Sequence, residues 1–546
     1  MSGKRNRLGA RFVGRLGSTH VKPTPLPEPT PPEPTPPEPT PFSFPNVLYA
    51  NASTAQTNMM RGFENIINTS PQINLRQSDF NQGTLRITQP GYYVLSENIV
   101  FNPATLFPTQ QQIDSGLYPI GTDGPYHLGF FGAIAVETSN VVIDLNGRSV
   151  TQSVEHNLQQ RFFAVVELAN SPFIPGQGPH SFIDTFGWRP ASNTLIMNGG
   201  LLNSSHHGVH GNDNANVMVY NTTITNYEVA GVALNGATGS IVSNNVMKGN
   251  NTTVNILSSF PQSIFALRAL KQLGEETSPV YTALKSDVDL ATSEILNNQP
   301  QTTYFQNTTG KYDGNMYGIV LNIKGVVINK FIEERTEAMD GNQDILVMSN
   351  TMRDVDTHPV EIVALKAGDG TGGAYGGKRM VGPFGDVFDI EKIMDGERKY
   401  IGNTLSDAQL FIAENHPGTG TTNITQDVID WSNSDPKTAL PGTLEFIPEG
   451  DSMGHFMKGN IGIFVSAGID IKLLNNTITN VITSGTDVGN SPLLTEEQRY
   501  YHASNSYGIL QTASANVTGV ETNTISNVVT SQPTKAEAVA TKEINQ

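Results

Sequence analysis

A run of ionisable side chains at positions 204–213, SSHHGVHGND, holds the densest set of groups that could move protons. His206, His207 and His210 are followed by Asp213, and histidines near a carboxylate are common general acids and bases. The interleaved glycines indicate a turn, in which stacked histidines hydrogen-bonded to asparagine would have a structural role alone. A catalytic and a structural interpretation of this cluster are therefore both open.

A second charged run, RDVDTHPVEIVALKAGDG, begins at position 353. Its ionisable residues are Arg353, Asp354, Asp356, His358, Glu361 and Lys366. Alternation along a strand predicts that the two aspartates share one face, with the histidine after a turn. Solvated charges on the rung of a repeat would give the same pattern, so catalysis and solvation are both consistent with it.

A third group could bind a hard cation, because DGNQD places Asp340, Asn342 and Asp344 at the 1, 3, 5 spacing of a calcium loop. The sixth position lacks glycine and the twelfth lacks glutamate. Ca²⁺ is thus the one candidate ligand ion, and no organic cofactor is predicted.

The elements that position these residues repeat along the chain. TLIMNGG near Asn193, NVMVYNTTITN from Asn216 and GSIVSNNVMKGN from Gly239 are short strands that end in polar turns. Aligning Val219 with Val242 gives a step of 23 residues. Such a step, with short strands and no long helix, is typical of a β-solenoid, in which residues like Val242 stack inward and turn asparagines form hydrogen-bonded ladders.

The same pattern returns far downstream. NTM at 350, NNTI at 475 and NTI at 523 follow the alternating strands DILVMSN, IDIKLLN and NVTGVETN. YGIVLNI, IGIFVSA and YGILQTA precede those strands. From about residue 140 to residue 529 the pattern resembles the right-handed parallel β-helix proteins of the pectin-lyase-like superfamily. The expected fold is all-β: a right-handed parallel β-helix with helical and loop insertions.

The resemblance implies two kinds of site. Polygalacturonase-like members carry a Gly-His-Gly turn beside paired aspartates, and here GVHG at Gly208–Gly211 is similar to that turn. The sequence contains no Asp-Asp pair, and no Arg-x-Lys follows the turn. Polysaccharide lyases of this fold use arginine or lysine as a base, often with Ca²⁺, and residues of these types are Arg353 and Lys366.

Composition restricts the class of protein. The net charge of −17 argues against a body that grips nucleic acid, because phosphate contacts need clustered lysine and arginine. The chain has no cysteine, so disulfides and thiolate metal sites are impossible. No apolar run approaches the ~18 residues of a membrane span. A soluble protein without a transmembrane segment is expected.

Segments outside the repeat differ in composition. Residues 1–22 are basic and predict a disordered arm for an anionic partner, and the PPEPT repeats of residues 23–45 predict a polyproline II spacer. Residues 46–139 predict an N-terminal cap with a hairpin or first coil, and residues 140–530 the β-helix. Insertions are expected near 256–300, which is helical, and 367–451, with a tail at 531–546.

A basic arm, a stiff spacer and a solenoid body look similar to β-helix proteins of large DNA viruses and to phage tailspikes. That resemblance implies a virion or extracellular surface, a homotrimer, and polysaccharide or other capsid and surface proteins as partners. The first hypothesis is a structural or surface-display protein that binds glycans. The alternative is a polysaccharide lyase or glycoside hydrolase.

Overall fold

The fold is described from a computed structural model of the chain. It describes residues 41–103, 132–159, 163–168, 191–227, 229–249, 267, 270, 273–296, 316–322, 342–357, 379–381, 387–389, 404, 407–408, 411, 415, 460–465, 468–483, 506–512, 515–530 and 537–544. The basic arm and most of the predicted spacer, residues 1–40, lie outside the described residues.

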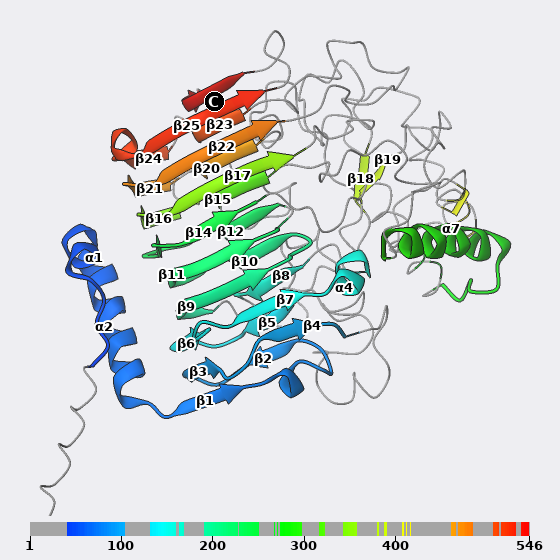
Figure 1. Cartoon of the computed structure of the whole chain (residues 1–546), viewed down its shortest axis with the longest axis horizontal. Helices are drawn as coiled ribbons and strands as arrows, with labels where there is room; N and C mark the ends of the chain where they lie inside the picture. Colours follow the sequence, from blue (N-terminus) through cyan, green and yellow to red (C-terminus); the bar gives the residue numbers. More distant parts are fainter. Residues whose placement is uncertain are drawn as a thin grey trace, which may run out of the picture. The chain divides into compact units, whose positions relative to one another are not determined.

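Parallel strands form two large sheets, which we call sheet A and sheet B (Figure 1). Sheet B contains β2 (Leu85–Ile87), β5 (Gly132–Val136), β8 (Ala164–Glu167), β10 (His207–Asn212), β12 (Ala230–Asn235), β15 (Met316–Asn322), β20 (Asn460–Val465), β23 (Ser506–Thr512) and β26 (Ala538–Ile544). Neighbours in this order pair in parallel register, for example β10 with β12.

Sheet A has two limbs. The first limb contains β1 (Gln72–Leu75), β3 (Gly91–Leu95), β6 (Val141–Asp144), β9 (Ser192–Leu202), β11 (Ala215–Thr225), β13 (Ile241–Ser243), β16 (Asn342–Met348), β21 (Gly468–Leu474) and β24 (Ala515–Thr518). The second limb contains β4 (Ile99–Phe101), β7 (Ser149–Gln152), the ends of β9 and β11, β14 (Val246–Lys248), β17 (Thr351–Thr357), β22 (Thr477–Thr483) and β25 (Thr524–Thr530).

Each coil runs from sheet B through the first limb and the second limb and back to sheet B. β10, for example, leads into β11, which serves both limbs, and β12 then returns to sheet B. Val219 pairs with Val242, so the predicted step of 23 residues is the true register. The predicted all-β parallel solenoid is confirmed.

The core lies inside the coils, where side chains of one coil stack on those of the next. Ile224 and Val242 are fully buried there, as their β-branched types predicted. A glycine column lets sheet B approach the second limb closely. A Cβ on Gly318 would lie 2.5 Å from the carbonyl oxygen of Gly462 and 2.7 Å from Sδ of Met352. Gly318, the glycine of YGIVLNI, is therefore explained by sterics, because a larger side chain would clash with the neighbouring coil.

The predicted asparagine ladders are present. Inside the solenoid, Nδ2 of Asn245 donates to Oδ1 of Asn350 at 3.0 Å, Asn350 donates to Asn476 at 2.9 Å, and Asn476 donates to Asn523 at 2.8 Å. On the surface, Asn221 donates to Asn198 at 2.9 Å. Both members of this outer pair have positive φ, a conformation that asparagine tolerates better than most residues.

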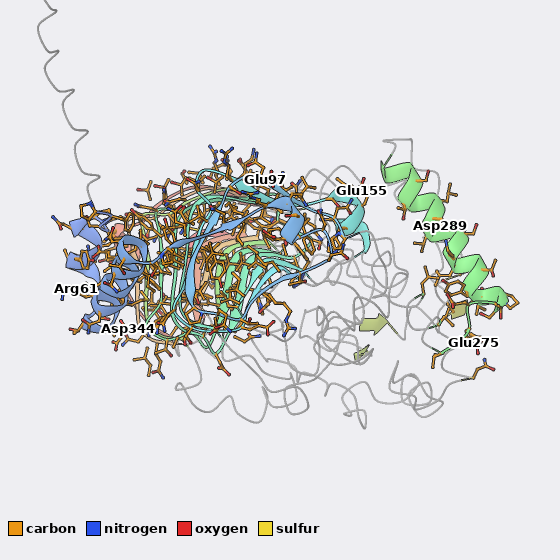
Figure 2. All side chains as sticks on the ribbon, turned by 90° about the horizontal axis from the view of Figure 1, so that it is seen from below. Arg61, Glu97, Glu155, Glu275, Asp289 and Asp344 are labelled. Carbon is orange, nitrogen blue, oxygen red and sulfur yellow. The ribbon has the colours of Figure 1, made fainter. Side chains whose placement is uncertain are left out.

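Two N-terminal helices, α1 (Asn46–Asn51) and α2 (Thr54–Thr69), pack on the outer face of the first limb (Figure 1). Ser53 and Gln56 form a capping box at the start of α2. Met60 and Phe63 of α2 are buried against the sheet. Figure 2, seen from below, shows side chains filling the coils and labels Arg61 and Asp344 on the side where α2 lies.

Two sequence-based boundaries need correction. The predicted spacer ran to residue 45, but Phe44 is only 3% exposed and its ring packs against Tyr220. For the segment around Gln89-Pro90-Gly91, the sequence left a hairpin and a first coil of the solenoid open. β2 and β3 lie in different sheets, so the segment belongs to a coil of the solenoid and not to a hairpin. Coils therefore begin before residue 140, the predicted start of the β-helix.

The remaining elements complete the described structure. They are α4 (Val154–Gln159), α7 (Pro279–Leu296), the 3-10 helices Gln77–Asp79 and Val520–Thr522, and the antiparallel pair β18 (Arg379–Val381) and β19 (Val387–Asp389). α7 lies within the segment that the sequence predicted to be a helical insertion. In the described part of the chain, no helix is both long enough and apolar enough to cross a membrane.

Candidate functional site

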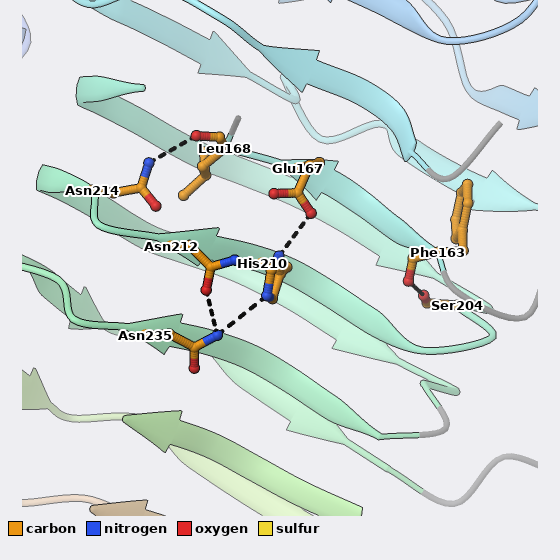
Figure 3. A network of polar contacts seen from close by, with 8 residues as sticks. All are labelled: Phe163, Glu167, Leu168, Ser204, His210, Asn212, Asn214 and Asn235. Carbon is orange, nitrogen blue, oxygen red and sulfur yellow. Dashed lines mark hydrogen bonds and ion pairs between the residues drawn. The ribbon is translucent and has the colours of Figure 1, made fainter. Parts of the chain in front are cut away.

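His207 and His210 lie on strand β10, with His206 in the bend just before it, which corrects the placement of the whole cluster in a turn. Along β10, Val209 points into the core, so His210 points outward from sheet B. The parallel register sets Glu167 of β8 beside His210 on one side, and Ala233 of β12 on the other. A carboxyl group 43 residues away is thus brought to the imidazole (Figure 3).

Glu167 and His210 form a close pair. Oε2 of Glu167 lies 2.7 Å from Nδ1 of His210. On the other side of the ring, Nδ2 of Asn235 lies 3.3 Å from Nε2 and 2.7 Å from Oδ1 of Asn212 (Figure 3). Because this amide donates to Asn212, its second hydrogen points to an unprotonated Nε2. The ring proton then lies on Nδ1 and is donated to Glu167.

Burial disfavours the charged form of each partner. It raises the pKa of Glu167 well above the ordinary range, and it lowers the pKa of His210 to about 3. Below the raised pKa of Glu167 the carboxyl group carries a proton. Oε1, which has no hydrogen-bond partner, is free to hold that proton while Oε2 still accepts from Nδ1 of His210.

His206 and His207 extend the cluster. The rings of His207 and His210 are stacked, with centroids 5.1 Å apart and planes 8° apart, and the His206 ring meets His207 edge-on at 4.2 Å. Burial lowers the pKa of His207 well below its ordinary value, and His206 and His210 lower it further by charge repulsion. His207 and His210 are therefore held in their neutral forms near pH 7.

A second polar network lies at the corner before β10. Nε2 of Gln152 contacts Nδ1 of His156 at 2.9 Å, and Oε1 of Gln152 accepts from the backbone N–H of Ser205 at 2.7 Å. The His156 ring lies edge-on to Phe101 and Phe163, with centroids 5.0 Å and 5.2 Å away. This network ties α4 to the chain just ahead of the histidines.

An ion pair lies on the outward face of sheet B, on strands nearer the N-terminus than β8 and β10. Nη2 of Arg86 donates to Oε2 of Glu137 at 2.6 Å, and the Glu137 side chain is fully buried. Arg86 is in register with Ala135, which is in register with Glu167. The outward face of sheet B is therefore polar over its first coils.

General acid or base chemistry requires a substrate to touch the reacting group. The side chains of Glu167 and His210 are 0% and 1% exposed, whereas His206 is half-buried.

Asp213 follows β10 in a left-handed conformation, with φ of 56°, and its backbone N–H donates to the carbonyl of Asn235. His210 thus has Glu167 of the neighbouring strand as a carboxyl partner.

The second predicted cluster is divided. Arg353 is exposed on β17, and Asp354, which has φ of 56°, accepts from Asn480 at 2.8 Å and lies 3.7 Å from Lys248. Asp356 is in register with Ile482. His358, Glu361 and Lys366 lie outside the described residues. Asp354 thus belongs to a surface ladder.

The predicted calcium ligands have other partners. Oδ1 of Asn342 accepts from the backbone of Ala237 at 2.9 Å, and Oδ2 of Asp344 accepts from the Ser53 hydroxyl at 2.6 Å. Asp340 lies outside the described residues. Within the described part of the chain, no group of three or more histidine, aspartate or glutamate side chains is placed to hold a metal ion. Asp344 instead anchors the start of α2.

Sequence reasoning missed Glu167, Gln152, His156 and Asn235. One signal could have found the first: aligning AVVELAN with GVHGNDN by their valines, Val166 and Val209, puts Glu167 beside His210. Asn235 lies one 23-residue step after Asn212 on β12, so the repeat also gives its position. Gln152 and His156 depend on how the corner between limb and sheet folds. The repeat pattern does not encode that corner.

Comparison with known proteins gives little similarity. No protein-family model matches the sequence, and no curated protein sequence matches it. A crystal structure of PfbA, a surface adhesin of Streptococcus pneumoniae, is similar at 9% identity and a TM-score of 0.29, covering 86% of this chain and 73% of that chain. A second structure of the pneumococcal surface protein and adhesin PfbA has 8% identity, a TM-score of 0.28 and coverages of 90% and 95%. Similarity at this level carries no conclusion about function.

Proposed function

We propose that this protein is a structural, surface-display solenoid that contacts glycans along its outward faces, on a virion or a cell surface. The observation that carries the proposal is the contrast between two faces. The Glu167–His210 pair of sheet B is buried, while the second limb of sheet A presents regular polar columns to solvent. A rigid array of exposed hydrogen-bonding groups suits binding without turnover.

The polar columns follow the register of the second limb. One column consists of Thr223, Val246, Thr351, Thr477 and Thr524, where valine interrupts the threonines once. The next column consists of Thr225, Lys248, Arg353, Thr479 and Ser526. Parallel strands repeat at ~4.8 Å, and β-branched threonine has few rotamers, so the hydroxyls are pre-arranged in space. The hydroxyl groups of an extended polysaccharide recur at comparable intervals. The columns therefore offer it several hydrogen bonds at little entropic cost.

A polysaccharide lyase or glycoside hydrolase is the alternative, and the Glu167–His210 pair is the observation that favours it. A neutral imidazole held by a carboxyl group is suited to accept a proton. For this function the pair must become accessible to substrate. Under the display proposal, the Glu167–His210 pair only links strand β8 to strand β10.

The experiment presents acidic and neutral polysaccharides to the purified full-length chain, with and without Ca²⁺. We expect binding on a glycan array, with neither release of reducing ends nor absorbance from unsaturated uronates. Replacing Thr351 and Thr477 by valine should weaken binding, whereas Thr54→Val on α2, at an exposed position, should not. Turnover that is lost in His210→Ala or Lys366→Ala would overturn the display proposal in favour of the enzyme.

A further inference from the structure

The outward face of sheet B is apolar over its later coils. Val232, Ile319 and Ile463 of this sheet point into the core, and the residues on the opposite side form a hydrophobic cluster of their own. We call this cluster the outer stripe. Its two columns follow the register of the strands and consist of Ala230, Tyr317, Ile461 and Tyr507, and of Ala233, Val320, Phe464 and Leu510.

The outer stripe is buried, although it faces away from the core. Val320, its most exposed member, is only 6% exposed, and Phe464 is fully buried. The rings of Tyr317 and Phe464 stack with their centroids 6.2 Å apart. Such contacts within the stripe bury the sides of the residues, but the surface that points away from the sheet is buried only by a further layer. The outer stripe therefore has a cover.

The helices and strands of the described structure do not supply this cover. Among the described residues, all members of the cluster belong to sheet B, and the partly buried residues packed against them are Val229, next to β12, and Val539 of β26. The first limb differs, because residues of α1 and α2 share a cluster with its outward residues. The outer stripe is buried in a single chain, so its cover is another part of this chain.

The two longest insertions leave the solenoid at one corner, between the second limb and sheet B. The coil that has no insertion here crosses the corner in residues 226–229, from β11 to β12. The next two coils insert residues 249–315 before β15 and residues 358–459 before β20. Insertions at the same place in successive repeats gather on one face. The corner adjoins the outer stripe, since Tyr317 and Ile461 are the second residues of β15 and β20.

Contacts of α7 distinguish the two insertions. α7 belongs to the first insertion and contacts α4, which follows β7 of an earlier coil. Its Asp287 accepts a hydrogen bond at 2.9 Å from the hydroxyl of Thr404, which belongs to the second insertion. The first insertion is thus engaged with a coil that precedes the outer stripe. The second returns from α7 to β20, whose Ile461 and Phe464 lie in the middle of the stripe.

We infer that the outer stripe is an internal docking face and that its occupant is the second insertion, residues 358–459. The insertion has apolar residues suited to this contact, in runs such as VIDW from Val428 and LEFI from Leu444. Two faces of the coil are then covered by the chain itself, the first limb by α1 and α2 and sheet B by the insertion. The second limb, with its exposed Thr223 and Arg353, stays open to a ligand. The inference does not depend on what that ligand is.

The test is photo-crosslinking within the full-length chain. Phe464→p-azidophenylalanine places a photoreactive group of similar size in the outer stripe, and mass spectrometry of the irradiated, digested protein should find it joined to peptides from residues 358–459. Tyr220→p-azidophenylalanine is the matched control on the first limb. Phe44 packs against Tyr220 with ring centroids 5.3 Å apart, so this variant should join to peptides that contain Phe44. Links from position 464 to other segments, or between two copies of the chain, would overturn the inference.

Cysteine accessibility gives a second readout, because the wild-type chain contains no cysteine. Val320→Cys changes the side-chain volume little and should react with a thiol reagent ~100-fold or more slowly than Thr223→Cys on the open second limb, since labelling of a covered residue requires local unfolding. Urea should abolish the difference. Circular dichroism and the thermal midpoint establish that both variants fold. Equal rates in the folded proteins would show that the outer stripe is uncovered and would overturn the inference, even if the variant at Phe464 does not fold.

Discussion

The internal asparagine ladder gives a sharp test of what holds the coils together. Asn350 is 1% exposed and its side chain makes four hydrogen bonds. Nδ2 donates to the Val242 carbonyl at 2.8 Å and to Oδ1 of Asn476 at 2.9 Å. Oδ1 accepts from the backbone N–H of Asn245 at 3.1 Å and from its Nδ2 at 3.0 Å. One side chain therefore links three consecutive coils.

Replacing Asn350 by alanine removes the side-chain partner of two buried backbone groups, the Val242 carbonyl and the Asn245 N–H. The side-chain amide of Asn245 loses one bond but keeps its bond to the Val219 carbonyl at 2.9 Å. At ~1–3 kcal/mol for each backbone group that loses this partner, we expect a loss of about 2–5 kcal/mol. The backbone does not oppose the change, because Asn350 is not among the residues with positive φ. The loss is therefore attributable to the ladder.

Asn221→Gly is the matched control. It removes an exposed ladder bond but keeps a residue that tolerates the φ of 52°. Its expected cost is below ~1 kcal/mol. Because long repeats unfold with incomplete cooperativity, urea unfolding should be combined with hydrogen exchange of the peptides that cover β13 to β17. Equal losses in the two variants would refute a stabilising role for the internal ladder.

Further predictions concern packing, protonation and the N-terminal arm. Val242→Asp should lower the free energy of unfolding by at least ~3 kcal/mol, and the surface change Lys248→Asp by less than ~1 kcal/mol; similar losses in urea unfolding would mean the strand faces are misassigned. Gly318→Ala should cost about 1–3 kcal/mol through overpacking, which the thermal midpoint measures. The folded-state pKa of Glu167 is raised, so its protonation stabilises the fold, and this contribution is lost as pH rises from the ordinary value of 4.5. The stability of wild type relative to Glu167→Gln should therefore fall with pH, and a rise would contradict the assignment. Deletion of residues 1–41 should leave the thermal midpoint unchanged, since the packed chain begins with Phe42 and Phe44; a marked decrease would show that the arm contributes to the fold.

The solenoid could be predicted because its information is local and repeated. The alignment of Val219 with Val242 fixes both the coil length and the inward face, and the asparagines mark the ladders within the same segments. The helices α1 and α2 could not be predicted in this way. Their buried face, which includes Met60 and Phe63, complements a stripe formed by seven strands of the first limb, with Tyr220 of β11 among its residues. That stripe exists only once the coils are stacked.

The Glu167–His210 pair was hidden for a related reason. Its partners are one coil apart in space but 43 residues apart in sequence, and their register follows only from the valines beside them. Asp213, which is closer in sequence, looked like the natural acid. Proximity in a solenoid is set by register along the axis, so the nearest acidic residue in the sequence is a poor guide to the partner of a catalytic candidate.

The row that contains this pair also shows where the repeat is broken. From Glu167 and His210 the same outward position of sheet B continues through Ala233, Val320, Phe464 and Leu510, and all four are buried. An apolar residue at His210 would extend that stripe without desolvating an imidazole and a carboxyl group. Retaining both groups costs stability unless each satisfies the other. The 2.7 Å contact satisfies Oε2 of Glu167 and Nδ1 of His210, whereas the buried Oε1 of Glu167 has no hydrogen-bond partner. The pair is therefore a specific junction between β8 and β10 that carries a desolvation cost, unlike the stacked apolar positions that follow it.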